Sequence, residues 1–373
     1  MNIILAGGGT GGHVYPALAI AEALRRRDPA ARVLFVGSRA GMEAALVPPA
    51  GIPFVGLSVS PPRSRAPLRV LRSLAGAGAS LGQAAVVLMR FHPDAVIATG
   101  GIAAVPSVMV AAALHMPIVV LEGNAVPGRA NRFLARFSRA VAVTSEGVGA
   151  SLAGGRIVVT GLPVRHEVYG ATREEGLRSF GLDPARRTVL VIGGSQGAVR
   201  LNAAVEGAVG HFSGRLDAQV IHQVGRGWDA AAPGRPAPQR PERVPYVRVP
   251  YLERIGEAYA CADLVVSRCG ANALAEITAC GLPSILVPYP YAADDHQTRN
   301  AEALVAAGAA VLLPDAALNG DALAAEIAAL LDNPGRLQTM ARAARGWGRR
   351  DAADRVVTLL ASLAQAAPAK ACE

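Results

Sequence analysis

Two glycine-rich turns in this chain have the composition of loops that bind anionic oxygen. The first, residues 7–12, lies between an apolar run and a helical pattern that opens near His13. The second, residues 193–197, also follows an apolar run and adds the hydroxyl of Ser195. Glycines let a ligand come close to the backbone, and the free N–H groups at a helix start attract phosphate oxygen. The sequence therefore predicts two phosphate-binding turns, half the chain apart.

The first turn also fits the G-x-G-x-x-G pattern of nicotinamide dinucleotide sites, at Gly7, Gly9 and Gly12. Such a site needs an acidic residue at the end of the second strand, where it binds the ribose. Residues 37–39, which follow the apolar run 33–36, are a glycine, a serine and an arginine. This order disfavours a dehydrogenase, although the arginine would suit a dinucleotide with a 2′-phosphate.

A third candidate segment combines a strand, a glycine turn and a helix that carries a carboxylate. Residues 267–276 run from an apolar strand through Gly270 into an alanine-rich helix that contains Glu276. Because its neighbours are apolar, Glu276 is not typical of a solvated helix face. A carboxylate at the carboxyl end of a strand can accept hydrogen bonds from both hydroxyls of a sugar diol. We expect this segment to bind a sugar.

Short apolar runs alternate with alanine- and leucine-rich helical stretches along the whole chain, and the pattern restarts after Arg165. Such alternation is typical of parallel sheets with helices on both faces. The sequence therefore predicts an α/β fold with two doubly wound, Rossmann-like domains, over residues 1–163 and 164–345. Ligands bind beyond the carboxyl ends of such strands, so we expect the chemistry in a cleft between facing domains. The proline-rich stretch 230–250 predicts a surface loop.

Composition and charge exclude several classes of protein. Apolar residues make up 51% of the chain and charged residues 17%, which excludes a mainly disordered protein. The positive charge is concentrated in residues 1–165, with 16 arginines against six acidic residues, so this half should meet an anionic surface. The four cysteines have no metal-binding or redox spacing, which predicts buried thiols in a reducing compartment. The first residues lack the pattern of a signal peptide, and the interrupted apolar stretch 103–121 predicts a helix and a strand rather than a membrane span.

Six short motifs occur in order along the chain and are highly specific as a set. They are Gly-Gly-Thr-Gly-Gly-His at 8–13, Asn-Ala-Val-Pro-Gly at 124–128, Pro-Val-Arg at 163–165, Gly-Gly-Ser-Gln-Gly at 193–197, Ser-Arg-Cys-Gly-Ala at 267–271 and Asp-Asp-His-Gln-Thr-Arg-Asn at 294–300. This set resembles the MurG family, which adds N-acetylglucosamine to lipid I and so makes lipid II of peptidoglycan. The resemblance implies a GT-B fold. Its first domain would face the acceptor and the membrane, its second would bind the UDP-sugar, and a last helix near 348–366 would pack back on the first.

The resemblance also implies roles for residues at matching positions. One group would bind the sugar and the diphosphate: Thr10, Gly11, Gly12 and Asn124 beside the donor sugar, and Arg165 and Ser195 on phosphate oxygens. A second group would bind the nucleotide and read sugar hydroxyls: Leu252 near uracil, Ala271, Asn272, Ala273, Leu274, Ala275 and Glu276 around the ribose, and His296 and Gln297 on the hydroxyls. Three usual polar residues of the family are replaced here, by Gly123, Leu162 and Ala273, and none of these changes removes a charge.

Transfer from a UDP-sugar requires stabilisation of the departing diphosphate, by a divalent cation on a D-x-D motif or by fixed protein dipoles. The sequence contains no D-x-D and no H-x-x-x-H or H-E-x-x-H motif. We therefore expect no essential metal and no cofactor. The leaving charge would fall on the turn after Gly193, on Ser195 and on Arg165.

The acceptor hydroxyl must lose its proton as it attacks the anomeric carbon, so a base is needed nearby. His13 is one candidate, because a helix N-terminus disfavours the imidazolium and leaves the ring able to accept a proton. Glu122, which follows the apolar run 118–121, is the competing candidate, and the sequence does not separate the two. Direct displacement predicts inversion, from an α-linked donor to a β-linked product.

Residues 61–74 combine arginines with an apolar stripe. Arginines beside exposed leucines would bind anionic lipid headgroups while the leucines enter the interface. An ordinary helix that faces the core is the alternative, and the implied polyprenyl-diphosphate acceptor favours the membrane. The predicted membrane-facing residues are Arg63, Arg65, Leu68, Arg69, Leu71, Arg72 and Leu74.

The expected partners are UDP-N-acetylglucosamine, lipid I, an anionic membrane surface and, further, proteins of cell-wall synthesis and division. We expect a peripheral protein at the cytoplasmic face of the bacterial inner membrane. Aromatic residues make up only 4% of the chain and no basic run alternates with them, so nucleic acid is not an expected partner. The alternatives are another GT-B UDP-sugar transferase with a lipid or small-molecule acceptor, and a catalytically idle membrane scaffold that senses UDP-sugar.

Overall fold

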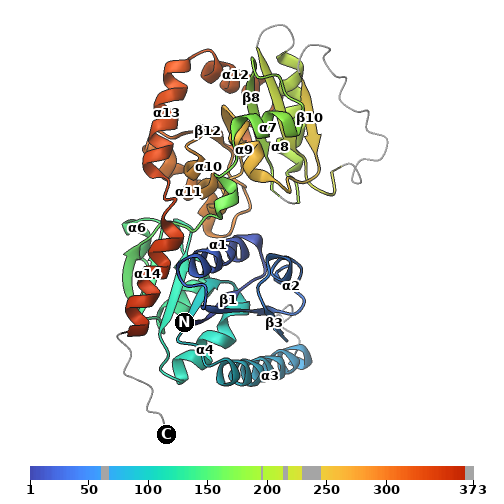
Figure 1. Cartoon of the computed structure of the whole chain (residues 1–373). Helices are drawn as coiled ribbons and strands as arrows, with labels where there is room; N and C mark the ends of the chain where they lie inside the picture. The colour runs from blue at the N-terminus through green and yellow to red at the C-terminus, as the bar shows by residue number, and fades with distance from the viewer. Residues whose placement is uncertain (60–66, 195, 213–216, 229–244, 366–373) are drawn as a thin grey trace. The chain divides into compact units, whose positions relative to one another are not determined.

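The computed structural model describes residues 1–59, 67–194, 196–212, 217–228 and 245–365, with the backbone alone for 67–75 and 77. The chain forms two compact units: unit 1 comprises Met1–Arg165 and Arg349–Glu373, and unit 2 comprises His166–Gly348 (Figure 1). Each unit contains one parallel sheet with helices packed against it, so the predicted fold of two doubly wound α/β domains is confirmed. The boundary predicted after residue 163 would assign Arg165 to the second domain. In the structure, Arg165 lies in unit 1.

Unit 1 has a seven-stranded sheet of order β3-β2-β1-β4-β5-β6-β7, in which all neighbours are parallel. Its strands are β1 (Asn2–Gly7), β2 (Arg32–Ser38), β3 (Phe54–Leu57), β4 (Ala95–Gly100), β5 (Ile118–Glu122), β6 (Ala140–Val143) and β7 (Arg156–Val159). Its α-helices are α1 (Gly11–Arg27), α2 (Glu43–Leu46), α3 (Pro67–Phe91), α4 (Val105–Ala113), α5 (Arg129–Ala135), α6 (Glu146–Gly149) and α14 (Ala352–Gln365).

Unit 2 has a six-stranded parallel sheet of order β10-β9-β8-β11-β12-β13. Its strands are β8 (Arg187–Ile192), β9 (Ala218–Gln223), β10 (Tyr246–Val249), β11 (Leu264–Ser267), β12 (Ser284–Leu286) and β13 (Ala310–Leu312). Its α-helices are α7 (Arg173–Phe180), α8 (Val199–His211), α9 (Ile255–Cys261), α10 (Ala271–Cys280), α11 (His296–Ala306), α12 (Gly320–Leu331) and α13 (Pro334–Trp347).

In each sheet the strand order reverses beside the strand that carries a glycine-rich turn. In unit 1, β1 lies between β2 and β4; in unit 2, β8 lies between β9 and β11. At such a switch point the loops after neighbouring strands run to opposite faces of the sheet and leave a crevice at the carboxyl ends. Both candidate phosphate-binding turns therefore lie where doubly wound sheets bind ligands.

The proline-rich stretch 230–250 is not a loop throughout, so that prediction is wrong for residues 246–249. These residues form β10, which pairs with β9 at the edge of the sheet. Pro245 and Pro250 flank the strand and do not interrupt its ladder, which is how an edge strand tolerates proline. Residues 229–244 lie outside the described residues.

The last helix, α14, packs against α1 within unit 1. Arg26 forms an ion pair with Asp354 at 2.9 Å, and Arg27 donates to the hydroxyl of Thr358 at 2.8 Å. The chain thus returns to unit 1 after Gly348 and covers the outer side of the helix that begins at the first glycine-rich turn.

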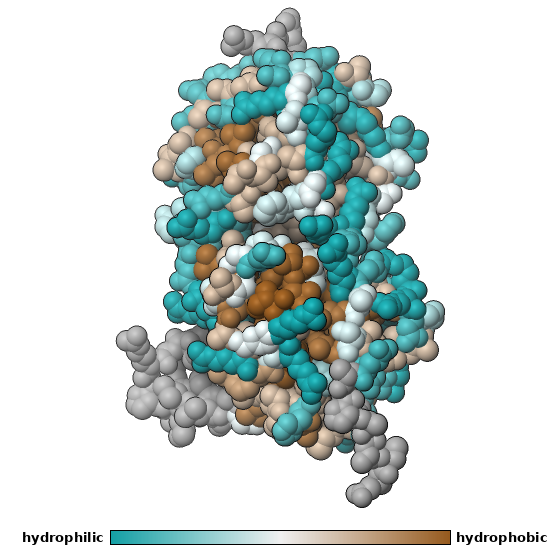
Figure 2. Space-filling model, turned by 90° about the vertical axis from the view of Figure 1, so that its left-hand side faces the viewer, coloured by the Kyte–Doolittle hydropathy of each residue, from teal (hydrophilic) through white to brown (hydrophobic). Residues whose placement is uncertain are grey.

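Most large apolar side chains are buried against the two sheets, but a few on α3 stay exposed. Leu81, Val86 and Met89 keep 40%, 43% and 55% of their surface accessible. Apolar side chains also gather on the side of unit 1 where α6 and α14 lie (Figure 2). None of the helices within the described residues has the length and apolar character needed to cross a membrane.

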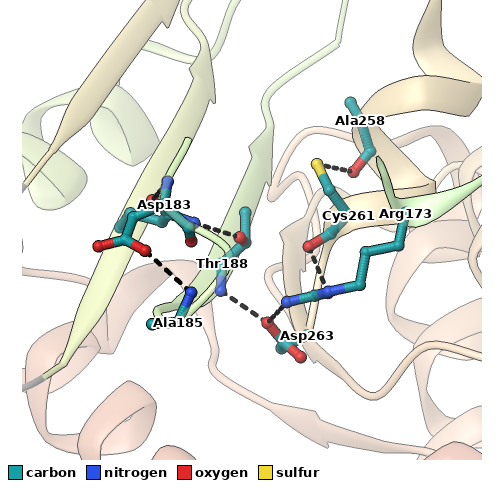
Figure 3. A network of polar contacts seen from close by, with 8 residues as sticks. Arg173, Asp183, Ala185, Thr188, Ala258, Cys261 and Asp263 are labelled. Atoms are coloured by element: carbon teal, nitrogen blue, oxygen red, sulfur yellow. Dashed lines mark hydrogen bonds and ion pairs between the residues drawn. The ribbon is translucent and has the colours of Figure 1, made fainter. Parts of the chain in front are cut away.

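At the amino edge of the unit 2 sheet, a polar network joins α7, β8 and the start of β11 (Figure 3). Asp263 accepts the N–H of Thr188 at 2.7 Å and an Nη2 hydrogen bond from Arg173 at 3.2 Å. Arg173 also donates to the carbonyl of Cys261 at 2.9 Å. This network lies at the edge opposite to the glycine-rich turn, whereas doubly wound sheets bind ligands at the carboxyl ends of their strands.

A second network lies buried beside the glycine-rich turn of unit 2. His222, on β9, lies between the hydroxyl of Tyr246 at 2.7 Å and Oδ1 of Asn202 at 3.1 Å. Because the amide nitrogen of Asn202 donates to the carbonyl of Val224, its oxygen is the acceptor and Nε2 of His222 carries the proton. Burial, with a smaller contribution from Arg248, lowers the pKa of His222 to about 3.

This buried histidine makes the stability of unit 2 depend on pH. The unfolded state binds a proton near pH 6.5 and the folded state only near pH 3, so stability is full above pH 6.5 and falls as the pH drops. We expect the wild type to lose about 2 kcal/mol more unfolding free energy than His222→Gln between pH 7 and pH 5. Both tryptophans, Trp228 and Trp347, lie in unit 2, so urea unfolding followed by fluorescence measures it. Equal losses in the two proteins would contradict this assignment.

Candidate active site

The first glycine-rich turn leads from β1 directly into α1. Gly8 and Gly9 have φ angles of 149° and 87°, which favour glycine, and Thr10 is the N-cap of the helix. Gly11 is half-buried and Gly12 is exposed. The predicted site residues Thr10, Gly11 and Gly12 therefore form the start of a helix at the switch point, where backbone N–H groups can bind anionic oxygen.

His13 lies in the first turn of α1 with its ring packed against the turn after β4. Its Nδ1 is 2.8 Å from the carbonyl oxygen of Gly8 and 3.4 Å from the hydroxyl of Thr10. A carbonyl oxygen can only accept, so Nδ1 carries the proton and Nε2 has the lone pair. A Cβ at Gly100 would lie 2.7 Å from Cδ2 of the ring, so only glycine fits beside it. The half-buried ring thus presents its lone pair at Nε2.

Glu122 ends β5 and is almost fully buried, with 1% of its surface exposed. Its Oε1 accepts the backbone N–H of Asn124 at 2.9 Å and the side-chain amide of Asn124 at 3.2 Å. Its Oε2 accepts the N–H of Gly128 at 3.0 Å and the amide of Asn131 at 2.9 Å. Four donors therefore surround the carboxylate, and they hold the loop 123–128. The side chain of Asn124, a predicted sugar contact, is part of this arrangement.

Arg165 lies against the helix that carries His13. Its guanidinium carbon is 4.4 Å from the ring centre of Tyr15, which is a favourable cation–π geometry. An edge of the same ring faces the helix start, because a Cβ at Gly11 would lie 3.0 Å from Cε2 of Tyr15. Tyr15 therefore places a fixed positive charge near the first glycine-rich turn.

The second glycine-rich turn borders a cavity of about 580 Å³, a size that suits a small-molecule ligand. Gly194 and Gly197 have φ angles of 92° and 78°, and the N–H of Gly197 donates to the carbonyl of Gly194 at 2.9 Å. Ser195 lies outside the described residues. Of the predicted nucleotide positions, Ala273 and Gln297 line this cavity.

Two arginines and an aspartate form the charged wall of the cavity. Arg268 forms an ion pair with Asp315 at 2.7 Å, and Arg200 approaches the other carboxylate oxygen at 3.2 Å. Arg268 also donates to the carbonyl of Pro288 at 2.9 Å. One aspartate faces two arginines, so the wall keeps a net positive charge, which favours an anionic ligand.

The other predicted nucleotide residues lie around the same edge of the sheet without lining the cavity. Glu276, on α10, accepts the hydroxyl of Tyr259 at 3.2 Å, and burial raises the pKa of Tyr259, with Glu276 adding to the effect. Leu252 is buried. The remaining residues are half-buried or buried on α10, at the start of the helix and in its middle: Ala271, Asn272, Leu274 and Ala275.

His296 and Gln297 open α11. Nδ1 of His296 is 2.7 Å from the carbonyl of Ala293, which leaves its Nε2 with the lone pair. The side-chain oxygen of Gln297 accepts the N–H of Cys269 at 3.1 Å and that of Tyr289 at 2.9 Å. Gln297, predicted to read sugar hydroxyls, therefore joins two loops of the cavity wall, and only its amide nitrogen is left for a ligand.

The predicted membrane-facing residues are only partly described. Leu68, Arg69, Leu71, Arg72 and Leu74 belong to α3, and their side chains lie outside the described part of the chain, as do Arg63 and Arg65 entirely.

Sequence reasoning missed several residues that shape both turns. Tyr15 and Glu43 lie beside the first turn, and Arg268 and Asp315 form the wall beside the second. Arg268 lies in the segment 267–276, which the sequence already indicated, but nothing in the sequence pairs it with Asp315, 47 positions further on. Within the described residues, no group of three or more histidine, cysteine, aspartate or glutamate side chains is arranged to hold a metal ion.

Two doubly wound units, each with a glycine-rich turn at its switch point, form the architecture of the GT-B fold. Because one fold can support several activities, the class of protein comes from the comparisons with known proteins. Models of the glycosyltransferase family 28 N-terminal and C-terminal domains match residues 3–143 and 188–356. A relative from Desulfitobacterium hafniense (strain Y51) is 42% identical over 366 residues, which cover 96% of this chain and 98% of the relative. Its name is UDP-N-acetylglucosamine--N-acetylmuramyl-(pentapeptide) pyrophosphoryl-undecaprenol N-acetylglucosamine transferase.

The protein of the same name from Desulforudis audaxviator (strain MP104C) is 40% identical over 368 residues, covering 98% of this chain and 99% of the relative. The crystal structure of Acinetobacter baumannii MurG superposes with a TM-score of 0.75 at 28% identity, covering 97% of this chain and 99% of that one. The chain therefore belongs to glycosyltransferase family 28, as a member of its MurG family.

The double role of the Gln297 side-chain oxygen leads to a prediction with two variants. Gln297→Met leaves two backbone N–H groups unpaired, so the unfolding free energy of unit 2 should fall by about 2 kcal/mol. Gln297→Glu keeps both acceptors and should stay within about 0.5 kcal/mol of the wild type, but its charge should weaken UDP binding about tenfold. Tryptophan fluorescence in urea and calorimetric titration with UDP measure the two effects. A Gln297→Met chain as stable as the wild type would contradict the assignment.

Proposed function

We propose that this chain transfers N-acetylglucosamine from UDP-N-acetylglucosamine to the 4-hydroxyl of the N-acetylmuramoyl residue of lipid I, with inversion, and so makes lipid II. The observation that carries the proposal is the pair of glycine-rich turns at the two switch points, with His13 beside one and a positively lined cavity beside the other. The curated relatives carry in their names the donor and the pyrophosphoryl-undecaprenol acceptor of this reaction.

His13 is the proposed base. Its Nε2 has the lone pair, because Nδ1 donates to the carbonyl of Gly8. Glu122, the competing candidate, has two donors on each carboxylate oxygen, so a proton on either oxygen would displace a hydrogen bond that is already made. We therefore assign Glu122 a positioning role, in which its carboxylate shapes the loop that presents Asn124.

The donor is proposed to bind at the second turn. The diphosphate would accept the N–H groups of Gly193 and Gly194 and the hydroxyl of Ser195, because the N–H of Gly197 already donates to the carbonyl of Gly194. Fixed dipoles of this kind stabilise a leaving diphosphate without reorganisation during the reaction. Glu276 is the proposed ribose contact, and the amide nitrogen of Gln297 and Nε2 of His296 are the proposed contacts to sugar hydroxyls.

The purified chain, given radiolabelled UDP-N-acetylglucosamine and a short-chain lipid I analogue, should produce labelled lipid II analogue. His13→Gln should lower kcat by about 10²- to 10⁴-fold with little change in UDP affinity, because it removes only the proton acceptor. The exposed His115, replaced in His115→Gln, is the matched control and should keep the wild-type rate.

Other outcomes of this assay would decide between the alternatives. Transfer to a different acceptor would indicate another UDP-sugar transferase of the same fold, and binding of UDP-sugar with no transfer to any acceptor would indicate a sensor. A His13→Gln chain with full activity would show that the base is elsewhere.

We also propose that unit 1 binds the cytoplasmic face of the inner membrane as a peripheral protein, where its lipid acceptor is held. The exposed Leu81, Val86 and Met89 on α3 and the excess of arginine in residues 1–165 support this reading. Association with proteins of cell-wall synthesis and division remains an expectation of the resemblance alone.

The double variant Val86→Ser and Met89→Ser should bind vesicles that contain anionic lipid about tenfold more weakly than the wild type, since two apolar side chains no longer enter the interface. Flotation with vesicles of phosphatidylglycerol and phosphatidylcholine measures the bound fraction. Val305→Ser removes an exposed apolar side chain from α11 of unit 2 and is the control that should bind normally. Equal binding by all three proteins would place the membrane contact on another surface.

A further inference from the structure

The carboxylate of Glu43 lies beneath the first glycine-rich turn with none of its surface exposed. Its Oε2 accepts the N–H of Gly9 at 2.9 Å, and its Oε1 accepts the N–H of Ser38 at 2.8 Å. Both partners are donors, so both oxygens act as acceptors, as in an ionised carboxylate. A buried charge is thus held by two backbone groups rather than by a cation of the described chain.

Glycine at three positions makes room for this carboxylate. A Cβ at Gly8 or at Gly41 would overlap the carboxylate oxygens, and a Cβ at Gly37 would lie 2.7 Å from Cγ. These glycines come from the turn after β1, the end of β2 and the segment before α2. The chain therefore keeps a pocket for Glu43 under the turn, at some cost in backbone entropy.

The peptide group between Gly8 and Gly9 connects Glu43 to His13. Its N–H donates to Glu43, and its carbonyl oxygen accepts from Nδ1 of His13 at 2.8 Å. A peptide group is planar and rigid, so one hydrogen bond fixes the direction of the other. Hydrogen bonds in such a chain polarise one another in the same sense. The carboxylate therefore acts on the imidazole through a single peptide unit.

We propose that Glu43 is a positioning residue for the transfer reaction. Through the Gly8–Gly9 peptide it holds His13 in the tautomer that leaves Nε2 free, and it stabilises the positive charge that the ring gains. In the step itself, the acceptor O–H bond breaks and its proton moves to Nε2. The acceptor oxygen bonds to the anomeric carbon, and the bond to the UDP oxygen breaks. Glu43 keeps its charge throughout. The inference rests on the proposed function, in that His13 is taken as the base.

The other polar and charged groups near His13 belong to other elements. A Cβ at Gly100 would touch both the His13 ring and, at 3.2 Å, Oδ1 of Asn131, whose amide donates to the carboxylate of Glu122. The charged group of Arg165 lies over the ring of Tyr15, which is on the same helix as His13. Both groups are unchanged in a Glu43 variant, so a change in the behaviour of His13 in that variant reports on Glu43.

The direct test is the tautomer of His13 in the full chain with ¹⁵N-labelled histidine, read from long-range ¹H–¹⁵N spectra. Signals of His13 are those that disappear in His13→Gln. The wild type should show the Nδ1–H form, and Glu43→Gln should show a substantial fraction of the Nε2–H form. An unchanged tautomer in a folded Glu43→Gln chain would overturn the proposal.

Kinetics provide the second readout. Glu43→Gln should lower kcat about tenfold to a hundredfold and leave KM for UDP-N-acetylglucosamine within about twofold. The imidazolium loses stabilisation, so the acidic limb of the kcat/KM profile should move to lower pH by about half a unit to one unit. Glu43→Asp keeps the charge and should recover part of kcat. A loss confined to KM, or an unmoved acidic limb, would contradict the proposal.

Two further variants keep the test decisive. Asp263→Asn removes another carboxylate that accepts a backbone N–H, in unit 2, and should lower stability without changing kcat or the His13 tautomer. If Glu43→Gln does not fold, Gly41→Ala displaces the carboxylate while its charge remains, and the tautomer should again become mixed.

Full activity in His13→Gln would overturn the base assignment alone, whereas an unchanged tautomer in the Glu43 and Gly41 variants would overturn the role of Glu43 alone.

Discussion

Close approach of backbone to backbone at positions without a Cβ is the constraint on which both candidate binding turns depend. A Cβ at Gly101 would overlap the carbonyl oxygen of Gly8, and a Cβ at Gly197 would overlap that of Val224. In each unit, therefore, the turn after the central strand packs directly on the turn of a neighbouring strand. That contact fixes where the N–H groups of the turn point, before any ligand arrives.

The arrangement of elements was predictable because buried parallel strands leave a strong pattern in the sequence. Runs such as 3–6 and 188–192 are continuous and apolar, and they became the central strands β1 and β8. The edge strands β3, β10 and β13 were missed, since they are only three or four residues long and partly buried, and prolines flank β10, whereas the edge strand β7 lies in an apolar run that was predicted. Sequence patterns report burial, and an edge strand has less of it.

The candidate site was less predictable than the fold, because a residue type shows what its side chain can do but not which group the side chain binds. Glu122 carries a carboxylate that could accept a proton, yet four donors already bind it. The oxygen of Gln297 binds two backbone N–H groups in unit 2. Glu43 was missed altogether, because its partners at Gly9 and Ser38 are backbone groups, which leave no trace in the sequence.

The polar side chains of the candidate site fall into two groups: those whose hydrogen bonds hold a loop, and those that keep an atom free to react. A buried carboxylate that accepts several N–H groups loses that stabilisation when it takes a proton, at about 1.5–3 kcal/mol for each charged hydrogen bond. An imidazole with one nitrogen donating to a carbonyl meets no such penalty, because the other nitrogen is the one that takes the proton. The hydrogen-bond donors around Glu43 and Glu122 therefore suit these carboxylates to hold a loop, and this difference is the reason why we propose His13 as the base.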